Sequence, residues 1–303
     1  LLASELTAYL DGKRDLSVLF FPSKRTSLDD FSSTKNCLLI NVLDNVRNRL
    51  ISVRKEGDRW IQEDLNTPGL GTVSAWGVDS ETSDDYWMTV TDFLTPASLY
   101  LGSLHTGDQR LIKSQPGFFA TKGLKIDQME AISKDGTRVP YFMVSKEDLA
   151  LNGQNPTLLY GYGGFEISML SSYRATTGIS WLENGGVYVL ANIRGGGEFG
   201  PRWHQAALKE NRQRAYDDFI AIAEHLIERK VTTPGHLGIR GGSNGGLLMG
   251  NMIVQRPELF KAVVCQVPLL DMKRFNKLLA GASWMGEYGN PDLPEEWAFL
   301  QKY

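Results

Sequence analysis

One serine in the sequence stands where a nucleophile could be built. Ser243 lies in the run GGSNGG, which matches G-x-S-x-G, between the strand-like residues LGIR and the helix-like residues LLMGNMIV. Glycines beside a serine permit a sharp bend, because without a Cβ they leave room for neighbouring backbone to pass close by. Such a strand-to-helix bend exposes the hydroxyl near a helix N-terminus, where the N–H of the next residue, Asn244, can stabilise an oxyanion. We therefore interpret Ser243 as a nucleophile rather than part of an ordinary glycine-rich turn.

The sequence does not supply an obvious base for this serine. A serine hydroxyl attacks a carbonyl only when a base removes its proton, and in α/β-hydrolases the acid and the histidine follow the serine along the chain. The four histidines all precede Ser243: His105, His204, His225 and His236. Asp271 and Glu287 follow the serine but come too soon for the usual acid position. We therefore expect the base to lie outside these 303 residues.

The serine bend belongs to a segment in which short apolar strands alternate with helices. A hairpin is expected around residues 134–137, followed by the strand-like runs TLLYGYGGF, GGVYVLANI, HLGIRGG and KAVVCQV. Residues 212–230 carry the apolar stripe of a helix: Tyr216, Phe219, Ile220, Ala223, Leu226 and Ile227. This alternation predicts a largely parallel sheet with helices on both faces. We expect the N-terminal portion of an α/β-hydrolase domain, with a partial doubly wound sheet, at residues 116–303.

Residues 1–115 have an all-β pattern. Short apolar or alternating runs are separated by charged and glycine-containing breaks: SVLFFPS, CLLINVL, RLISVRK, DRWIQED, GTVSAWGV, DYWMTVTDFL and SLYLGSL. Strands that recur at such short intervals are typical of a sandwich, a barrel or propeller blades. Without a clean internal repeat, the pattern alone leaves these three architectures open.

Composition and charge exclude several kinds of partner. The net charge is −3 and no basic patch dominates, so nucleic acid and anionic membrane surfaces are not expected. No apolar run approaches the ~20 residues that a membrane span needs. Cys37 and Cys265 lie far apart and are expected to be buried free thiols, which suits a reducing compartment and a cytoplasmic location. The sequence does not indicate an oligomeric state.

Four longer stretches together resemble a known family. They are TLLYGYGGFEIS, ANIRGGGEFGPRWHQAALKENRQRAYDDF, GGSNGGLLMGNMIVQRPELFKAVVCQVPLLDM and GASWMGEYG, in that order. They closely resemble the prolyl oligopeptidase family of serine peptidases, and the likeness runs from about residue 91 to residue 303. The resemblance implies the last blades of a β-propeller before the α/β-hydrolase domain. It also implies cleavage of short peptides after proline, with no metal or organic cofactor.

The resemblance assigns roles to six residues. Ser243 corresponds to the nucleophile, and Tyr162 corresponds to an oxyanion donor paired with the N–H of Asn244. Two aromatic residues correspond to the apolar walls that pack on the proline ring, and a third lines the same pocket: Phe165, Trp284 and Tyr288. Residue type alone would favour plain core packing for these three rings.

The sequence departs from the family pattern in ways that limit these expectations. The family's triad Asp and His lie beyond the position of residue 303, and most propeller blades are absent. We therefore expect an interior piece of a longer peptidase, inactive on its own. GASWMGEYG also differs from the eukaryotic pattern around the tryptophan. Proline is favoured because a sister branch that cleaves after Lys or Arg differs at YGGF, but a Lys, Arg or other preference stays the alternative.

Two hypotheses from other functional classes stay open. GGGEFG follows the strand-like run VYVLANI and matches G-x-G-x-x-G, with Asp217 and Asp218 at the spacing of a dinucleotide-binding oxidoreductase. Against it, Pro201 follows where a small-residue helix should begin, and the motif is not on the first strand of the sheet. A simpler interpretation is a loop that lets backbone pass close to the serine bend. The second hypothesis is a fragment that binds peptides without cutting them.

Overall fold

The computed structural model describes residues 1–68 and 71–303, which form two compact units. The first unit comprises Leu1–Pro116 together with Leu170–Tyr173, and the second comprises Gly117–Met169 and Arg174–Tyr303. The short segment Leu170–Tyr173 is joined to the first unit by bonds such as that from the Thr72 hydroxyl to the Ser171 carbonyl, 2.7 Å.

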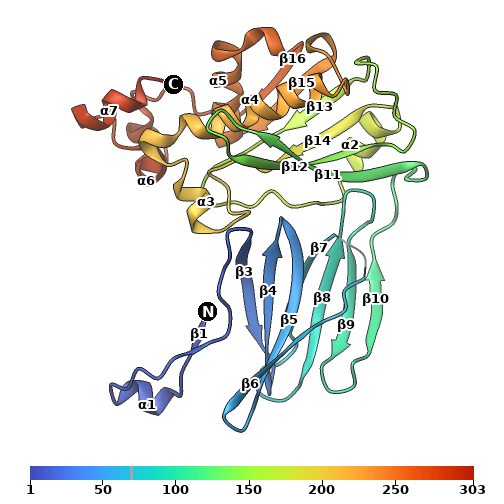
Figure 1. The fold of residues 1–303 in the computed structure, drawn as a ribbon, viewed down its shortest axis with the longest axis vertical. Helices are drawn as coiled ribbons and strands as arrows, with labels where there is room; N and C mark the ends of the chain where they lie inside the picture. The colour runs from blue at the N-terminus through green and yellow to red at the C-terminus, as the bar shows by residue number, and fades with distance from the viewer. Residues whose placement is uncertain (69–70) are drawn as a thin grey trace. The chain divides into compact units, whose positions relative to one another are not determined.

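The first unit contains two four-stranded antiparallel sheets, each a meander in which strands follow one another in chain order (Figure 1). A small ladder also pairs β1 (Leu2–Ala3) with β2 (Ser17–Val18), and the short helix α1 (Leu6–Leu10) lies between them in sequence. The first sheet contains β3 (Thr26–Ser33), β4 (Cys37–Asp44), β5 (Arg47–Glu56) and β6 (Arg59–Asp64). The second contains β7 (Thr72–Gly77), β8 (Asp85–Thr91), β9 (Ser98–Ser103) and β10 (Gln109–Ser114). Four-stranded meanders of this kind are the blades of β-propellers.

The middle of strand β4 is buried on both faces. Successive side chains of a strand point to opposite sides, and those of β4 enter two different apolar clusters. Leu39 packs with Val73 and Met88 of the second sheet, whereas Ile40 and Val42 belong to a separate cluster on the other side. The expected strand SVLFFPS is wrong beyond its first two residues. Strands β3 and β10 were not predicted, because their sequences TSLDDFSS and QRLIKS are polar and largely exposed, as edge strands often are.

The second unit is built on one six-stranded sheet in the order β11-β12-β14-β13-β15-β16. The expected hairpin joins β11 and β12, and β12 pairs antiparallel with β14. The remaining pairings, β14–β13, β13–β15 and β15–β16, are parallel. The strand bounds are β11 (Leu124–Ile132), β12 (Arg138–Lys146), β13 (Thr157–Tyr160), β14 (Val187–Ala191), β15 (Leu237–Gly242) and β16 (Ala262–Gln266).

Helices cover the two faces of this sheet unequally. Helix α4 (Gln213–Glu228) packs on β11 and β12, helix α5 (Asn244–Gln255) packs on β15 and β16, and the two helices contact each other. Their buried side chains form one core with the inward residues of the strands. Phe142, Tyr188 and Leu190 alternate with those residues and are buried on the opposite face. The short helix α2 (Ala175–Thr177) contacts the π-helical turn η1 (Gly178–Leu182), and η1 contacts β14.

A group of short helices after β16 closes the core near the serine bend. They comprise η5 (Phe275–Lys277), η6 (Gly281–Trp284), α6 (Met285–Tyr288) and α7 (Pro294–Leu300). Their apolar side chains cluster with Leu247 of α5. The remaining helical turns are α3 (Pro201–Gln205), η2 (Lys209–Asn211), η3 (Pro234–His236) and η4 (Pro257–Leu259).

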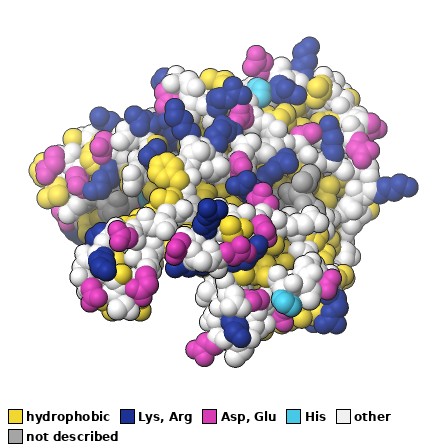
Figure 2. Space-filling view, turned by 60° about the horizontal axis from the view of Figure 1, so that its bottom comes forward, with side chains coloured by type: hydrophobic (Ala, Val, Ile, Leu, Met, Phe, Trp, Pro, Cys, Tyr) yellow, Lys and Arg dark blue, Asp and Glu magenta, His cyan; other side chains and the backbone are white. Residues whose placement is uncertain are grey.

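The surface and the cysteines give two further observations. On the face seen in Figure 2, basic and acidic side chains are interspersed. Within residues 1–68 and 71–303, no helix has the length and apolar character to cross a bilayer. Cys37 and Cys265 are free thiols, but both are half-buried rather than buried as expected. Cys37 is the first residue of β4 and precedes its buried middle, and Cys265 lies on β16, none of whose residues is fully buried.

Candidate active site

The predicted bend is present between β15 and α5. Ser243 is exposed and has φ 57° and ψ −117°, a conformation that non-glycine residues adopt only where the surrounding structure imposes it. Its N–H donates to the Gln266 carbonyl at 3.0 Å, and its own carbonyl accepts from the Gly246 N–H at 2.9 Å. These bonds tie the bend to β16 on one side and to the first turn of α5 on the other.

Two glycines of the motif are required by close backbone contacts. A Cβ added to Gly241 would lie 2.3 Å from the Gly245 carbonyl oxygen, and one added to Gly245 would lie 2.6 Å from the Gly161 carbonyl oxygen. Both distances are far below van der Waals contact. The expected close approach of neighbouring backbone to the glycines of the motif is therefore confirmed at these two positions.

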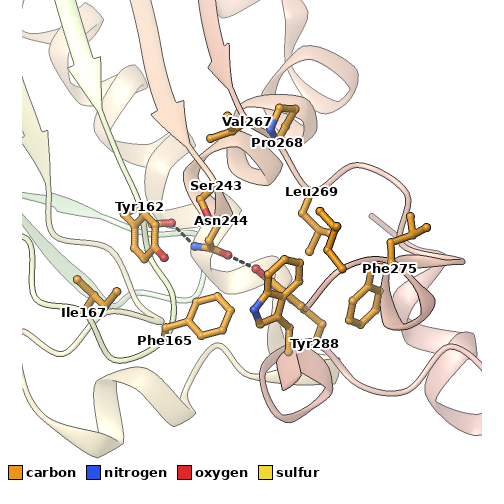
Figure 3. Close-up of a pocket in the computed structure, with 13 residues that line it drawn as sticks. Tyr162, Phe165, Ile167, Ser243, Asn244, Val267, Pro268, Leu269, Phe275 and Tyr288 are labelled. Atoms are coloured by element: carbon orange, nitrogen blue, oxygen red, sulfur yellow. Dashed lines mark hydrogen bonds between the residues drawn. The ribbon is translucent and has the colours of Figure 1, made fainter. Parts of the chain in front are cut away.

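Tyr162 and Asn244 lie beside Ser243 (Figure 3). Burial raises the pKa of Tyr162, and a side-chain hydrogen bond with Ser243 partly opposes this effect. The side chain of Asn244 is buried, and its Nδ2 donates to the backbone carbonyl of Tyr162 at 2.6 Å. The loop that carries Tyr162 is thus attached directly to the first residue of α5.

All six residues predicted for the site line one pocket of about 500 Å³. Phe165 meets Tyr288 edge to face, with ring centroids 5.8 Å apart. Trp284 is packed in the same apolar cluster. Leu269, Phe275 and Leu278 add to the apolar lining. A pocket with a polar end at the serine and an apolar, aromatic remainder is suited to hold a small ring beside a carbonyl group.

A buried polar cluster, which we call the Arg212 cluster, lies next to this pocket. It consists of Arg212, Asn244, Glu287, Tyr288 and His204. The Arg212 side chain is 0% exposed and that of Glu287 is 4% exposed. Arg212 Nη1 donates to Glu287 Oε1 at 3.0 Å, and Arg212 Nη2 donates to Asn244 Oδ1 at 2.5 Å. The other carboxylate oxygen of Glu287 lies 2.7 Å from His204 Nε2.

None of the described histidines is hydrogen-bonded to Ser243. Both ring nitrogens of His204 face carboxylates, Glu287 at 2.7 Å and Glu166 at 3.6 Å. His225 contacts the Tyr141 hydroxyl at 3.1 Å, and His236 contacts the Thr233 hydroxyl at 3.0 Å. His204 lies in the short helix α3.

The glycine-rich run GGGEFG forms the predicted close backbone contacts. A Cβ on Gly195 would lie 2.4 Å from the carbonyl oxygen of Gly163, in the loop that carries Tyr162. The dinucleotide hypothesis offers two acids, Asp217 and Asp218. Asp218 is fully buried and paired with Arg194 at 2.6 Å, so it cannot also bind a ribose. Asp217 is half-buried on helix α4 and accepts a hydrogen bond from Gln213 Nε2 at 2.9 Å.

Two protein-family models match this chain and show to which family it belongs. Residues 11–115 match the model described as "Prolyl oligopeptidase, N-terminal beta-propeller domain", and residues 172–303 match that of the "Prolyl oligopeptidase family". The chain belongs to the prolyl oligopeptidase family. The two sheets of the first unit are accordingly blades of its propeller, and the second unit is part of its α/β-hydrolase domain.

Individual members of the prolyl oligopeptidase family are similar over most of this chain. An uncharacterized peptidase, y4nA, of Sinorhizobium fredii is 51% identical over 94% of this chain and 39% of its own length. A prolyl endopeptidase of Elizabethkingia miricola is 36% identical over 79% of this chain and 34% of its own. A post-proline cleaving enzyme of Rickettsia typhi superposes with a TM-score of 0.90 and 38% identity, covering 97% of this chain and 42% of that one. The chain therefore spans about two fifths of these relatives.

The Arg212 cluster was missed in the sequence although its residues lie in stretches that resemble the prolyl oligopeptidase family. Arg212 is in KENRQRAYDDF, and Glu287 is in GASWMGEYG. We considered Glu287 only as a triad acid. The available signal was Glu287 directly before the pocket residue Tyr288, but the contacts of the cluster join residues that are 32 to 122 positions apart in the sequence.

Proposed function

We propose that this chain carries the nucleophile, the oxyanion donors and the proline pocket of a serine endopeptidase that cleaves short peptides after proline. The observation that carries the proposal is the strained, exposed Ser243 at the end of an apolar pocket, with Tyr162 beside it. The domain boundary that we propose near residue 116 separates the propeller blades from the part of the chain that does this chemistry.

The proposed reaction is acyl transfer in two steps. Ser243 Oγ attacks the carbonyl carbon of the proline residue, and a histidine from outside these residues takes the proton of the hydroxyl. Tyr162 Oη and the Asn244 N–H donate to the oxyanion of the tetrahedral intermediate. The histidine then gives the proton to the leaving amine as the peptide bond breaks, and water hydrolyses the acyl-enzyme. Phe165 and Trp284 would flank the proline ring, with Tyr288 lining the same pocket.

Proline specificity is supported by the pocket rather than by the bend alone. A Lys or Arg side chain would need an acidic group in the pocket to pair with its charge. The residues that line the described pocket include no Asp or Glu, and aromatic rings fit the flat face of proline. This observation favours proline over the alternative of cleavage after Lys or Arg.

The test uses the full-length gene product that contains these residues. We expect it to release nitroaniline from a blocked Gly-Pro-nitroanilide, and at least 100-fold more slowly from the Arg counterpart. A fluorophosphonate probe should label the protein at Ser243. Ser243→Ala should abolish labelling and reduce turnover by about 10⁶-fold, as loss of the nucleophile does in other serine peptidases. Turnover that survives Ser243→Ala would contradict the assignment.

The same substrates distinguish a peptidase from a protein that only binds peptides. Because no described histidine reaches Ser243, residues 1–303 expressed alone should show no turnover above the Ser243→Ala background. Hydrolysis by residues 1–303 that depends on Ser243 would show that the base is among them. Saturable peptide binding by an intact full-length protein that never releases product would favour the non-catalytic hypothesis.

A further inference from the structure

We propose that Arg212 and Glu287 are positioning residues that hold the oxyanion donor and the proline pocket in one geometry. The inference rests on the proposed function, because it assigns to these residues an effect on acyl transfer. Neither residue lines the pocket. They would act through Asn244, whose N–H is the expected oxyanion donor, and through Phe165, which forms a pocket wall.

The first step concerns the side chain of Asn244, which is held at both ends. Its Nδ2 donates to the Tyr162 carbonyl at 2.6 Å. Its Oδ1 accepts from Arg212 Nη2 at 2.5 Å and from the Tyr288 hydroxyl at 2.7 Å. A planar amide fixed in this way restricts rotation of its own backbone. The direction of the Asn244 N–H is therefore coupled to Arg212. The same side-chain amide also links Asn244 to Tyr162, whose hydroxyl is the second expected oxyanion donor.

The second step concerns the backbone at Phe165. Phe165 and Glu166 both have φ of 57°, a left-handed conformation that is unfavourable for residues other than glycine. Three hydrogen bonds hold this turn. The Phe165 N–H donates to Glu287 Oε1 at 3.0 Å, the Glu166 N–H donates to the Gly195 carbonyl at 3.1 Å, and the Ile167 N–H donates to the Gly164 carbonyl at 3.1 Å. Without the Glu287 carboxylate, the turn could relax and the ring of Phe165 would move.

The third step is that one oxygen connects the two effects. Glu287 Oε1 accepts both from Phe165 N–H and from Arg212 Nη1, each at 3.0 Å. The pocket wall and the oxyanion donor thus share one buried ion pair. A charge of this kind is costly to bury unless its partner is present, so removing one member alone leaves an uncompensated charge. A test of positioning must therefore separate geometry from folding.

The first two variants keep the buried charge balanced, and the two Glu287 variants remove the same charge but differ in whether a hydrogen-bond acceptor remains. Arg212→Lys retains the positive charge, but an ammonium group lacks the fork that lets guanidinium reach Asn244 and Glu287 together. The double variant Arg212→Met with Glu287→Met removes both charges. Glu287→Gln keeps an oxygen that can accept from Phe165 N–H, whereas Glu287→Ala does not. Leu226→Ala, a fully buried change on α4, which begins next to Arg212, serves as the stability control.

Activity is measured on the full-length gene product with Pro-nitroanilide and Ala-nitroanilide substrates, alongside thermal unfolding. We expect the double variant to lose about 100-fold in kcat, the scale of a small misplacement of catalytic groups. Its preference for proline over alanine in kcat/KM should fall as well. Arg212→Lys should lose about 10-fold in kcat with an unfolding temperature near that of the wild type. Glu287→Gln should recover much of the proline preference that Glu287→Ala loses.

The outcomes separate this inference from the proposed function. If the wild type hydrolyses neither substrate, the proposed function fails and the positioning role fails with it. If the wild type is active but the Arg212 and Glu287 variants lose no more kcat or proline preference than Leu226→Ala at a matched unfolding temperature, the pair is purely structural. A kcat loss in Arg212→Lys without a stability loss supports positioning.

Discussion

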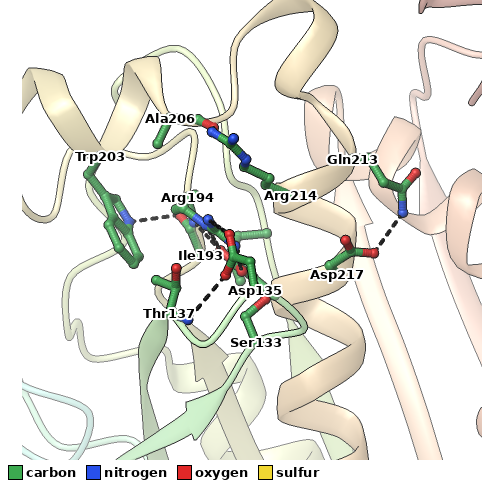
Figure 4. A network of polar contacts seen from close by, with 11 residues as sticks. Ser133, Asp135, Thr137, Ile193, Arg194, Trp203, Ala206, Gln213, Arg214 and Asp217 are labelled. Atoms are coloured by element: carbon green, nitrogen blue, oxygen red, sulfur yellow. Dashed lines mark hydrogen bonds and ion pairs between the residues drawn. The ribbon is translucent and has the colours of Figure 1, made fainter.

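Two buried arginines in the second unit differ in their partners: Arg194 binds two carboxylates, whereas Arg212 binds one carboxylate and one amide. The guanidinium of Arg194 binds Asp218 through two atoms, Nε at 2.9 Å and Nη2 at 2.6 Å, and reaches Asp135 through Nη1 at 2.5 Å. These contacts lie around the β11–β12 turn, as part of the network in Figure 4. Arg212 makes one bond to a carboxylate, Glu287, and directs another donor to the neutral amide of Asn244.

The difference indicates what each arginine does. Arg194 satisfies carboxylates on helix α4 and on the hairpin turn, so it fastens secondary structure. None of its hydrogen-bond partners lines the pocket. Arg212 contacts an amide whose residue does line the pocket, so its geometry is transmitted to the site. Both guanidinium groups are buried and ion-paired, so the chemistry of their further partners is what separates fastening from positioning.

The largest effect should come from removing the buried partner of Arg194. Asp218→Ala leaves a nearly buried guanidinium with the half-exposed Asp135 as its one carboxylate partner, so we expect a loss of about 3–5 kcal/mol in the free energy of unfolding. Urea denaturation of the full-length gene product measures this loss. The kcat per folded molecule should stay within about two-fold of the wild type, in contrast to the Arg212 variants. A kcat loss as large as theirs in folded Asp218→Ala would end the distinction between the two arginines.

A second prediction concerns a buried carboxyl in the glycine-rich run that lies between the two arginines in sequence. Glu198 is fully buried and accepts hydrogen bonds from the Met169 N–H and from Asn192 Nδ2. Burial raises its pKa from 4.5 to about 7. The native state therefore keeps a proton that the unfolded chain releases above about pH 4.5, so stability falls as the pH rises from 4.5 to 7 and levels off above 7.

Glu198→Gln should remove this pH dependence, because glutamine cannot ionise. The effect is on the order of 3 kcal/mol, since one unit of pKa corresponds to about 1.4 kcal/mol. Urea denaturation at pH 5 and pH 8 measures it. Glu183→Gln, which changes an exposed carboxylate in the same unit, is the control and should leave the slope of the unfolding free energy against pH unchanged. An unchanged slope in Glu198→Gln would mean that Glu198 is ionised in the folded protein.

Sequence reasoning succeeded where chemistry and local order coincide. The bend at Ser243, the glycines at positions 241 and 245 and the order of strands and helices around them are encoded within a few neighbouring residues. The Arg212 cluster could not be predicted in this way, because its contacts join residues from α3, α5 and α6, which only the folded sheet brings together. Likewise, the spacing of Asp218 suggested a ribose ligand, yet its partner is Arg194, 24 residues earlier.

The smallest effect should distinguish the two carboxylates that share Arg194. The Asp135 side chain is 43% exposed, whereas that of Asp218 is 0% exposed. The hydrogen bond from Arg194 lowers the pKa of Asp135 well below its usual range. The stability that ionised Asp135 contributes is complete at neutral pH. It is lost as the pH falls below about 4, toward the lowered pKa of the folded state. Solvent screens an exposed pair, so Asp135→Asn should cost only about 1 kcal/mol at pH 7, and less in high salt.

Urea denaturation at pH 7 and pH 3, with and without salt, measures this difference. Asp127→Asn, which breaks the exposed pair with Lys125 on the same hairpin, is the matched control and should cost less than Asp135→Asn. If Asp135→Asn costs as much as Asp218→Ala, exposure does not decide the strength of an arginine contact in this cluster. In that case the hairpin turn, rather than helix α4, would be the main attachment point of Arg194, and its fastening role would have to be reassigned to the turn.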